Sequence, residues 1–71
     1  MTTQTIEIKV NGNRRQVAAD LTVQSLLLEL GIRGDRVAVE LDKQIVPKRD
    51  WSSRYVPEGG ELEIVEFVGG G

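Results

Sequence analysis

The chain has 71 residues, nine basic and eleven acidic side chains, a formal net charge of −2, and neither cysteine nor histidine. This length corresponds to one domain, and the missing residue types exclude disulfides, thiol catalysis and metal sites built on thiolate or imidazole. The acidic balance argues against nucleic-acid binding, and no apolar run approaches the ~20 residues of a membrane span, so we expect a cytoplasmic protein.

The first segment predicts a β-hairpin. In IEIKV, apolar and polar side chains alternate, which places Ile6, Ile8 and Val10 on one face of a strand. The NGN that follows is typical of a tight hairpin turn, because Asn and Gly tolerate positive φ. The return strand is expected over residues 14–18, with Val17 facing inward.

The next segment, TVQSLLLELG, predicts one short helix. Thr22 can cap its first turn with a side-chain oxygen. Gly31 can take the left-handed conformation that ends the helix, with Ile32 folding back onto the last turn. A helix this short must pack on a sheet to be stable. The apolar residues that recur at helical spacing, and so form the face toward the sheet, are Val23, Leu26, Leu27 and Leu30.

Three further strands are expected in the second half of the chain. VAVEL predicts a strand over residues 37–41, QIV a short strand that Pro47 ends, and ELEIVEFV a last strand over residues 61–68. Between the last two, KRDWSSRYV predicts a single helical turn and a loop in which Trp51 packs over the sheet edge, and PEGG predicts a tight turn. The residues expected to face inward are Val37, Val39, Leu41, Leu62 and Ile64.

The order of these elements predicts an α+β fold. One main helix packs on one face of a mixed, four- to five-stranded sheet, and a right-handed crossover places the last strand beside the first, in the centre of the sheet. That layout is the β-grasp, or ubiquitin-like, fold. We expect residues 1–68 to form the β-grasp domain and residues 69–71 to form a flexible C-terminal tail.

The tail consists of three glycines, Gly69, Gly70 and Gly71, which follow the last strand without a linker. Chain ends are commonly loose, and such a tail can be inert. A terminal carboxylate, however, is ionised at neutral pH and can attack the α-phosphorus of ATP to form an acyl adenylate. Glycines have no side chains, so they allow the tail to enter a narrow nucleotide pocket of another protein. The carboxylate of Gly71 is therefore a candidate adenylation site.

Two apolar residues near the tail, Val65 and Phe67, are out of phase with Leu62 and Ile64 and should point away from the helix. Single exposed apolar residues are ordinary, but an apolar patch beside a functional tail is where a partner would dock. With Val68, these two residues form the predicted partner-docking surface. We expect no catalytic side chain, no bound cofactor and no metal site.

Residues 45–51, IVPKRDW, followed by PEGGELEIVEFVGGG, resemble the ThiS family, the sulfur carrier proteins of thiamin (thiazole) biosynthesis. The Val-Pro, the basic residue and the Trp favour this family over other β-grasp proteins that end in Gly-Gly, such as ubiquitin and the small subunit of molybdopterin synthase. The hairpin and the LTVQSLLLELG helix are also similar, so the resemblance covers nearly the whole chain. Two positions depart from the family: Asp42, where Asn is frequent, and Gly69, where another residue is frequent.

The resemblance implies a protein cosubstrate and not an enzyme. An adenylating, ThiF-like activating enzyme would use MgATP to adenylate the Gly71 carboxylate. Sulfur supplied indirectly by a cysteine desulfurase relay would then replace AMP and leave a terminal thiocarboxylate. A ThiG-like thiazole synthase would take this sulfur to build the thiazole phosphate.

Three alternatives remain open at this point. The chain could carry sulfur for another pathway, namely molybdopterin, cysteine or tRNA thiolation. It could be a ubiquitin-like modifier whose tail is joined to target lysines. It could also be a binding module whose glycines are inert.

Overall fold

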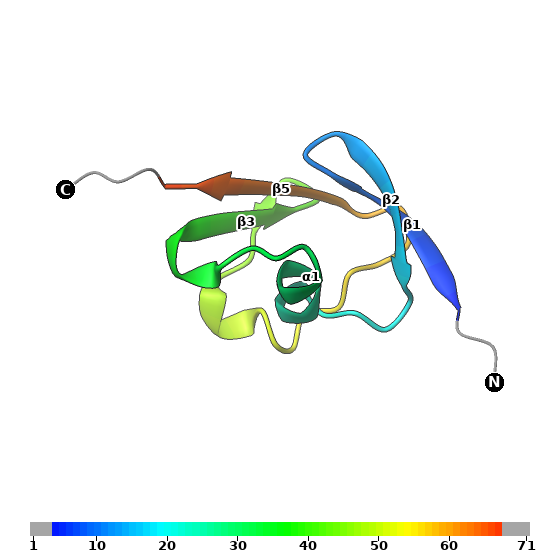
Figure 1. Cartoon of the computed structure of the whole chain (residues 1–71), viewed down its shortest axis with the longest axis horizontal. Helices are drawn as coiled ribbons and strands as arrows, with labels where there is room; N and C mark the ends of the chain where they lie inside the picture. The colour runs from blue at the N-terminus through cyan, green and yellow to red at the C-terminus, as the bar shows by residue number, and fades with distance from the viewer. Residues whose placement is uncertain (1–3, 68–71) are drawn as a thin grey trace.

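A five-stranded mixed sheet carries the single α-helix on one face, and the strand order is β2-β1-β5-β3-β4 (Figure 1). The computed structural model describes residues 4–67 of the chain. The elements in chain order are β1 (Thr5–Val10), β2 (Asn13–Ala18), α1 (Val23–Glu29), the 3-10 turn η1 (Gly34–Arg36), β3 (Val37–Leu41), β4 (Gln44–Ile45), the 3-10 turn η2 (Lys48–Asp50) and β5 (Glu61–Glu66).

The central strand pair confirms the predicted topology. β1 pairs antiparallel with β2 and parallel with β5, and β5 pairs antiparallel with β3. The last strand therefore lies beside the first, in the middle of the sheet, as expected for a β-grasp fold. The predicted boundary after residue 68 and the tail over residues 69–71 lie outside the described residues.

The hairpin forms because its turn needs two residues at positive φ. Asn11 has φ 50° and Gly12 has φ 84°, the combination of a type I′ turn that matches the twist of the flanking strands. The return strand begins at Asn13, slightly earlier than predicted. On the helix side, Ile8 and Val17 are buried, as the alternation predicted.

Side-chain and backbone caps at both ends define helix α1. The Thr22 hydroxyl accepts a hydrogen bond from the Ser25 N–H at 3.1 Å. At the other end, Gly31 takes φ 73°, and the Ile32 N–H donates to the Leu27 carbonyl at 2.9 Å, which closes the helix in a Schellman motif. The helical residues that the sheet buries are Val23, Leu26 and Leu27.

Trp51 lies inside the core and not over the sheet edge. It is 2% exposed, and its indole N–H donates to the Val46 carbonyl at 2.9 Å. This bond satisfies the one polar atom that the ring buries. A Cβ on Gly34 would lie 2.8 Å from the ring, so glycine at this position allows η1 to approach it. Trp51 thus links η1 and η2 to the β4 side of the sheet.

Strand β5 is shorter than predicted, ending at Glu66 and not at residue 68. The Phe67 N–H still donates at 2.8 Å to the carbonyl of Arg36, the residue just before β3, so this contact holds the chain for one residue beyond the strand. Leu62 and Ile64 are buried beneath the helix, as predicted. Within residues 4–67, no helix has the length and apolar character needed to cross a membrane.

Candidate functional site

The structure describes β5, the strand that precedes the predicted tail. It does not describe Val68 or the tail residues Gly69, Gly70 and Gly71. β5 ends at one end of the molecule, and β1 begins near the other (Figure 1). Five residue pairs join β5 to β3, from Leu41 opposite Leu62 to Val37 opposite Glu66. The chain is therefore part of the sheet as far as Glu66.

Both docking residues that the structure describes lie exposed beside this strand end. Val65 is 56% exposed and Phe67 is 60% exposed, and both point away from the helix because they alternate with the buried Leu62 and Ile64. Their predicted orientation is confirmed. Their role in docking stays a prediction.

The sheet register adds three residues to this surface that sequence reasoning missed. Val65 lies directly opposite Ala38 on β3. The hydrogen bond from the Val46 N–H to the Val39 carbonyl extends the β3–β4 register by one pair, and Pro47 is the next residue along the chain. Ile45, which pairs with Glu40 on the same face, is 71% exposed.

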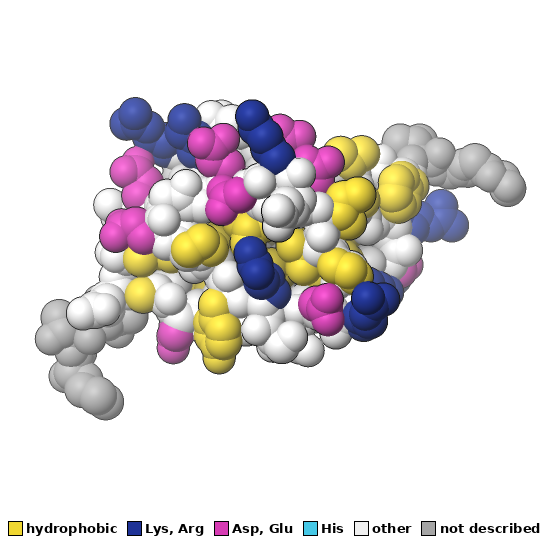
Figure 2. Space-filling model, turned by 180° about the vertical axis from the view of Figure 1, so that it is seen from behind, with side chains coloured by type: hydrophobic (Ala, Val, Ile, Leu, Met, Phe, Trp, Pro, Cys, Tyr) yellow, Lys and Arg dark blue, Asp and Glu magenta, His cyan; other side chains and the backbone are white. Residues whose placement is uncertain are grey.

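We call this surface the outer-face patch. Figure 2 shows hydrophobic side chains gathered beside the C-terminal end of the described chain. No sequence signal marked the contribution of β3 and β4, because it depends on which strands are neighbours. The members of the outer-face patch are the exposed Ile45, Val65 and Phe67 and the half-buried Ala38 and Pro47.

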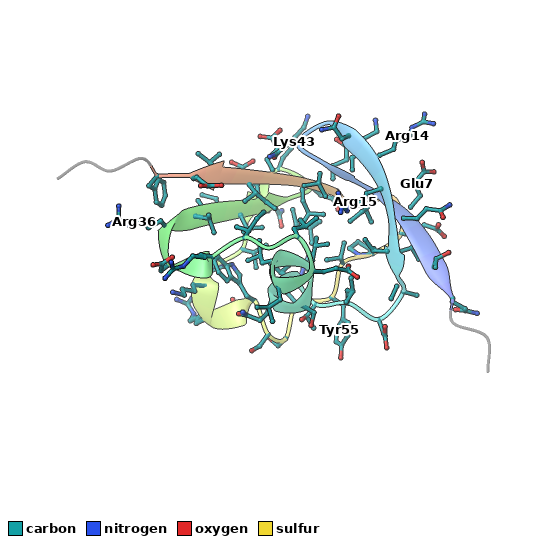
Figure 3. The ribbon with its side chains drawn as sticks, viewed as in Figure 1. Glu7, Arg14, Arg15, Arg36, Lys43 and Tyr55 are labelled. Carbon is teal, nitrogen blue, oxygen red and sulfur yellow. The ribbon has the colours of Figure 1, made fainter. Side chains whose placement is uncertain are left out.

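Charged side chains border the outer-face patch on two sides. Behind it, away from the tail, Glu63 lies opposite Glu40 on the neighbouring strand. At the tail end, Arg36 lies beside the end of β5 (Figure 3), and it lines a groove of about 540 Å³ together with Arg33 and Glu66. A partner that covers the patch would therefore meet carboxylates on one side and a mixture of guanidinium groups and carboxylates on the other.

The described residues offer surface and not a cleft with reactive side chains. Across residues 4–67 there is no buried charged or polar residue and no group of acidic side chains placed to hold a metal ion. The salt bridge of this part of the chain, Arg14 to Glu7 at 3.8 Å, is exposed and lies at the other end of the molecule from Arg36 (Figure 3).

The sheet order, the single helix and the central last strand define a ubiquitin-like β-grasp protein. The model of the ThiS family matches residues 8–71. This chain belongs to the ThiS family of sulfur carrier proteins.

Three comparisons illustrate this membership. The sulfur carrier protein ThiS of Escherichia coli (strain K12) is 32% identical over 66 residues, which cover 93% of this chain and 100% of that protein. The crystal structure of a thiamine biosynthesis protein (ThiS) from Geobacter metallireducens matches with a TM-score of 0.82 and 30% identity, over 93% of this chain and 100% of that one. A thiazole synthase of Paramagnetospirillum magneticum is 44% identical over 66 residues, but this chain spans only 20% of its length.

Proposed function

We propose that this chain is the sulfur carrier for thiazole formation in thiamin biosynthesis, and that its sulfur is carried on the carboxyl group of Gly71. The observation that carries the choice of pathway is the similarity to part of a thiazole synthase. In that protein of Paramagnetospirillum magneticum, the segment similar to this chain makes up 20% of the length. Joining a carrier to a second unit in one polypeptide raises the effective concentration of each for the other, which favours thiazole synthase as the acceptor.

The chemistry needs three steps at the chain end. A carboxylate oxygen of Gly71 attacks the α-phosphorus of ATP and displaces pyrophosphate, which forms an acyl adenylate. The outer sulfur of a persulfide on the sulfur relay then attacks the carbonyl carbon and displaces AMP, which forms an acyl disulfide. A partner thiol cleaves its S–S bond, is oxidised to a disulfide in doing so, and leaves the thiocarboxylate. ATP, Mg²⁺ and the sulfur donor belong to partner proteins, namely a ThiF-like activating enzyme and a cysteine desulfurase relay. The chain itself serves as a cosubstrate.

The length of the tail explains why a docking surface should lie beside it. Four residues follow Phe67, and four residues can span at most about 14 Å. Because the proposed reacting group is the Gly71 carboxylate, the nucleotide pocket of the activating enzyme should lie within this distance of Phe67. The outer-face patch is an apolar surface beside the end of β5, and exposed apolar patches commonly mark protein–protein contacts.

The test is the intact mass of the full-length chain after incubation with MgATP, the activating enzyme and a sulfur donor. We expect a gain equal to the mass difference between sulfur and oxygen, and no gain when ATP is omitted. A chain that keeps its original mass under complete conditions would exclude the proposal.

A second measurement distinguishes thiazole formation from other sulfur pathways. The thiocarboxylate form is offered separately to thiazole synthase and to the large subunit of molybdopterin synthase. We expect thiazole synthase to remove the sulfur from the thiocarboxylate and return the chain to its carboxylate form. Consumption with the molybdopterin enzyme alone would leave the carrier chemistry in place and reject the pathway.

The docking role of the outer-face patch gives a further prediction. Phe67→Asp should weaken the complex with the activating enzyme by about tenfold or more, because a central aromatic contact often dominates such an interface. It should not lower the unfolding temperature, because Phe67 is 60% exposed. Affinity is measured by titration calorimetry.

The matched control is Leu28→Asp, which places the same charge at a residue that is 70% exposed on α1. α1 lies on the opposite face of the sheet, so this change should leave the affinity unaltered. If both variants bind as tightly as the wild-type chain, the outer-face patch is not the docking surface.

A further inference from the structure

The side chain of Asn11 connects the β1–β2 turn to the middle of β5. Its Oδ1 accepts a hydrogen bond from the Ile64 N–H at 2.7 Å, and its Nδ2 donates to the Ile64 carbonyl at 3.2 Å. One carboxamide thus bonds both backbone polar groups of one strand residue, across a sequence separation of 53 residues.

These two bonds extend the sheet beyond the point where β1 ends. The ladder between β1 and β5 contains Lys9 opposite Glu61 and Val10 opposite Leu62, and the Asn11 N–H donates to the Leu62 carbonyl at 2.8 Å. The chain then turns away into β2. A carboxamide presents one donor and one acceptor, as a strand residue does, so Asn11 supplies the next step of the ladder with its side chain.

Past Ile64, β5 has backbone partners on one side within the described residues. Those partners are on the β3 side, where Ala38 lies opposite Val65 and the carbonyl of Arg36, the last residue of η1, accepts from the Phe67 N–H. The Asn11 contact is therefore the last support that β5 receives from the β1 side before the outer-face patch and the tail.

We infer that Asn11 is a positioning residue for the carrier reaction. Its carboxamide fixes the direction in which β5 presents Val65, Phe67 and the tail to the activating enzyme. A strand end held in this direction loses less conformational freedom when it binds, which improves affinity without a new contact. This inference rests on the proposed function, since it concerns the same encounter.

The turn alone would also favour Asn at this position, because Asn tolerates a φ of 50°. The variant Asn11→Gly separates the two explanations. Glycine fits the same turn without strain but makes neither bond to Ile64. The variant Asn11→Asp also fits the turn and keeps the acceptor, but it faces the Ile64 carbonyl with a second oxygen and not with a donor.

The chain supplies a matched control in its other type I′ turn. Asp42 has φ 51°, and its Oδ1 accepts from the Glu61 N–H at 3.0 Å. Asp42→Gly therefore also removes a side-chain bond to β5, but at the start of the strand, far from the tail. Any general loss of stability from weakening β5 should appear in both glycine variants.

The experiment measures hydrogen exchange of the Phe67 amide in the free chain, and the KM and kcat for adenylation by the activating enzyme. The Phe67 N–H donates to the Arg36 carbonyl and not to Asn11, so its exchange reports movement of the strand end. In Asn11→Gly, the hydrogen-exchange rate of the Phe67 amide should rise about tenfold. The KM for the carrier should also rise about tenfold, with kcat unchanged. For Asn11→Asp, the exchange rate of the Phe67 amide and the KM should be close to those of Asn11→Gly. For Asp42→Gly, the KM should equal that of the wild type.

The outcomes distinguish failure of the positioning role of Asn11 from failure of the proposed sulfur-carrier function. If the wild-type chain is adenylated and the Asn11 variants match Asp42→Gly in KM and in Phe67 exchange, Asn11 serves only the turn and the inference is wrong. If kcat falls and KM does not, Asn11 acts on the chemical step and not on presentation, which also contradicts it. A wild-type chain that is not adenylated rejects the proposed function itself.

Discussion

Deleting Gly70 and Gly71 should abolish sulfur acceptance and leave the unfolding temperature of the domain unchanged. The deletion shortens the reach beyond Phe67 by about 7 Å, so the new terminal carboxylate would stop short of the α-phosphate in the activating enzyme. The buried core residues in the part of the chain that the structure describes lie between Ile8 and Ile64, several residues before the deletion, so we expect their packing to persist. Intact mass after a complete sulfur-loading reaction, together with thermal unfolding, measures both effects.

A chain of full length whose terminus is converted to an amide is the matched control for reach. It preserves every residue of the tail but removes the nucleophilic oxygen. We expect it to bind the activating enzyme and to gain no sulfur. Sulfur loading of the amidated chain would show that the reactive group lies elsewhere, and normal loading of the truncated chain would show that the tail length is not needed.

Leu26→Ala should destabilise the fold by about 2–5 kcal/mol, because it leaves a cavity in the core. Leu26 is 0% exposed, at the centre of the helix face that packs on the sheet. A domain of this size has a total unfolding free energy of about 4–11 kcal/mol, so the variant should be partly unfolded at physiological temperature. The measurement is urea unfolding followed by circular dichroism.

Leu28→Ala provides the comparison, since it makes the same chemical change in the same helix at a side chain that is 70% exposed. Its effect should stay within about 0.5 kcal/mol, as for most surface substitutions. Equal destabilisation by the two variants would contradict the helix orientation and with it the assignment of the outer face of the sheet.

The outer-face patch shows how far the sequence could predict the candidate site. Alternation along β5 was enough to orient Val65 and Phe67, because side-chain direction in a strand depends only on odd or even position. Ala38, Ile45 and Pro47 could not be assigned to the same surface, because that requires knowing that β3 lies next to β5 and β4 next to β3. The role of the glycines rests on the family resemblance.

The sequence by itself determined the features whose physical cause is local. Asn11-Gly12 specifies a turn because both residues accept positive φ, Thr22 and Gly31 define the helix ends through bonds to nearby backbone, and periodicity selects the buried faces. The tertiary structure decided the contacts between distant segments: the burial of Trp51, the register that assembles the outer-face patch, and the Asn11 bonds to Ile64. The reason is that a hydrogen-bonding side chain near a turn has many possible partners in sequence, and only the packed sheet brings one of them within reach.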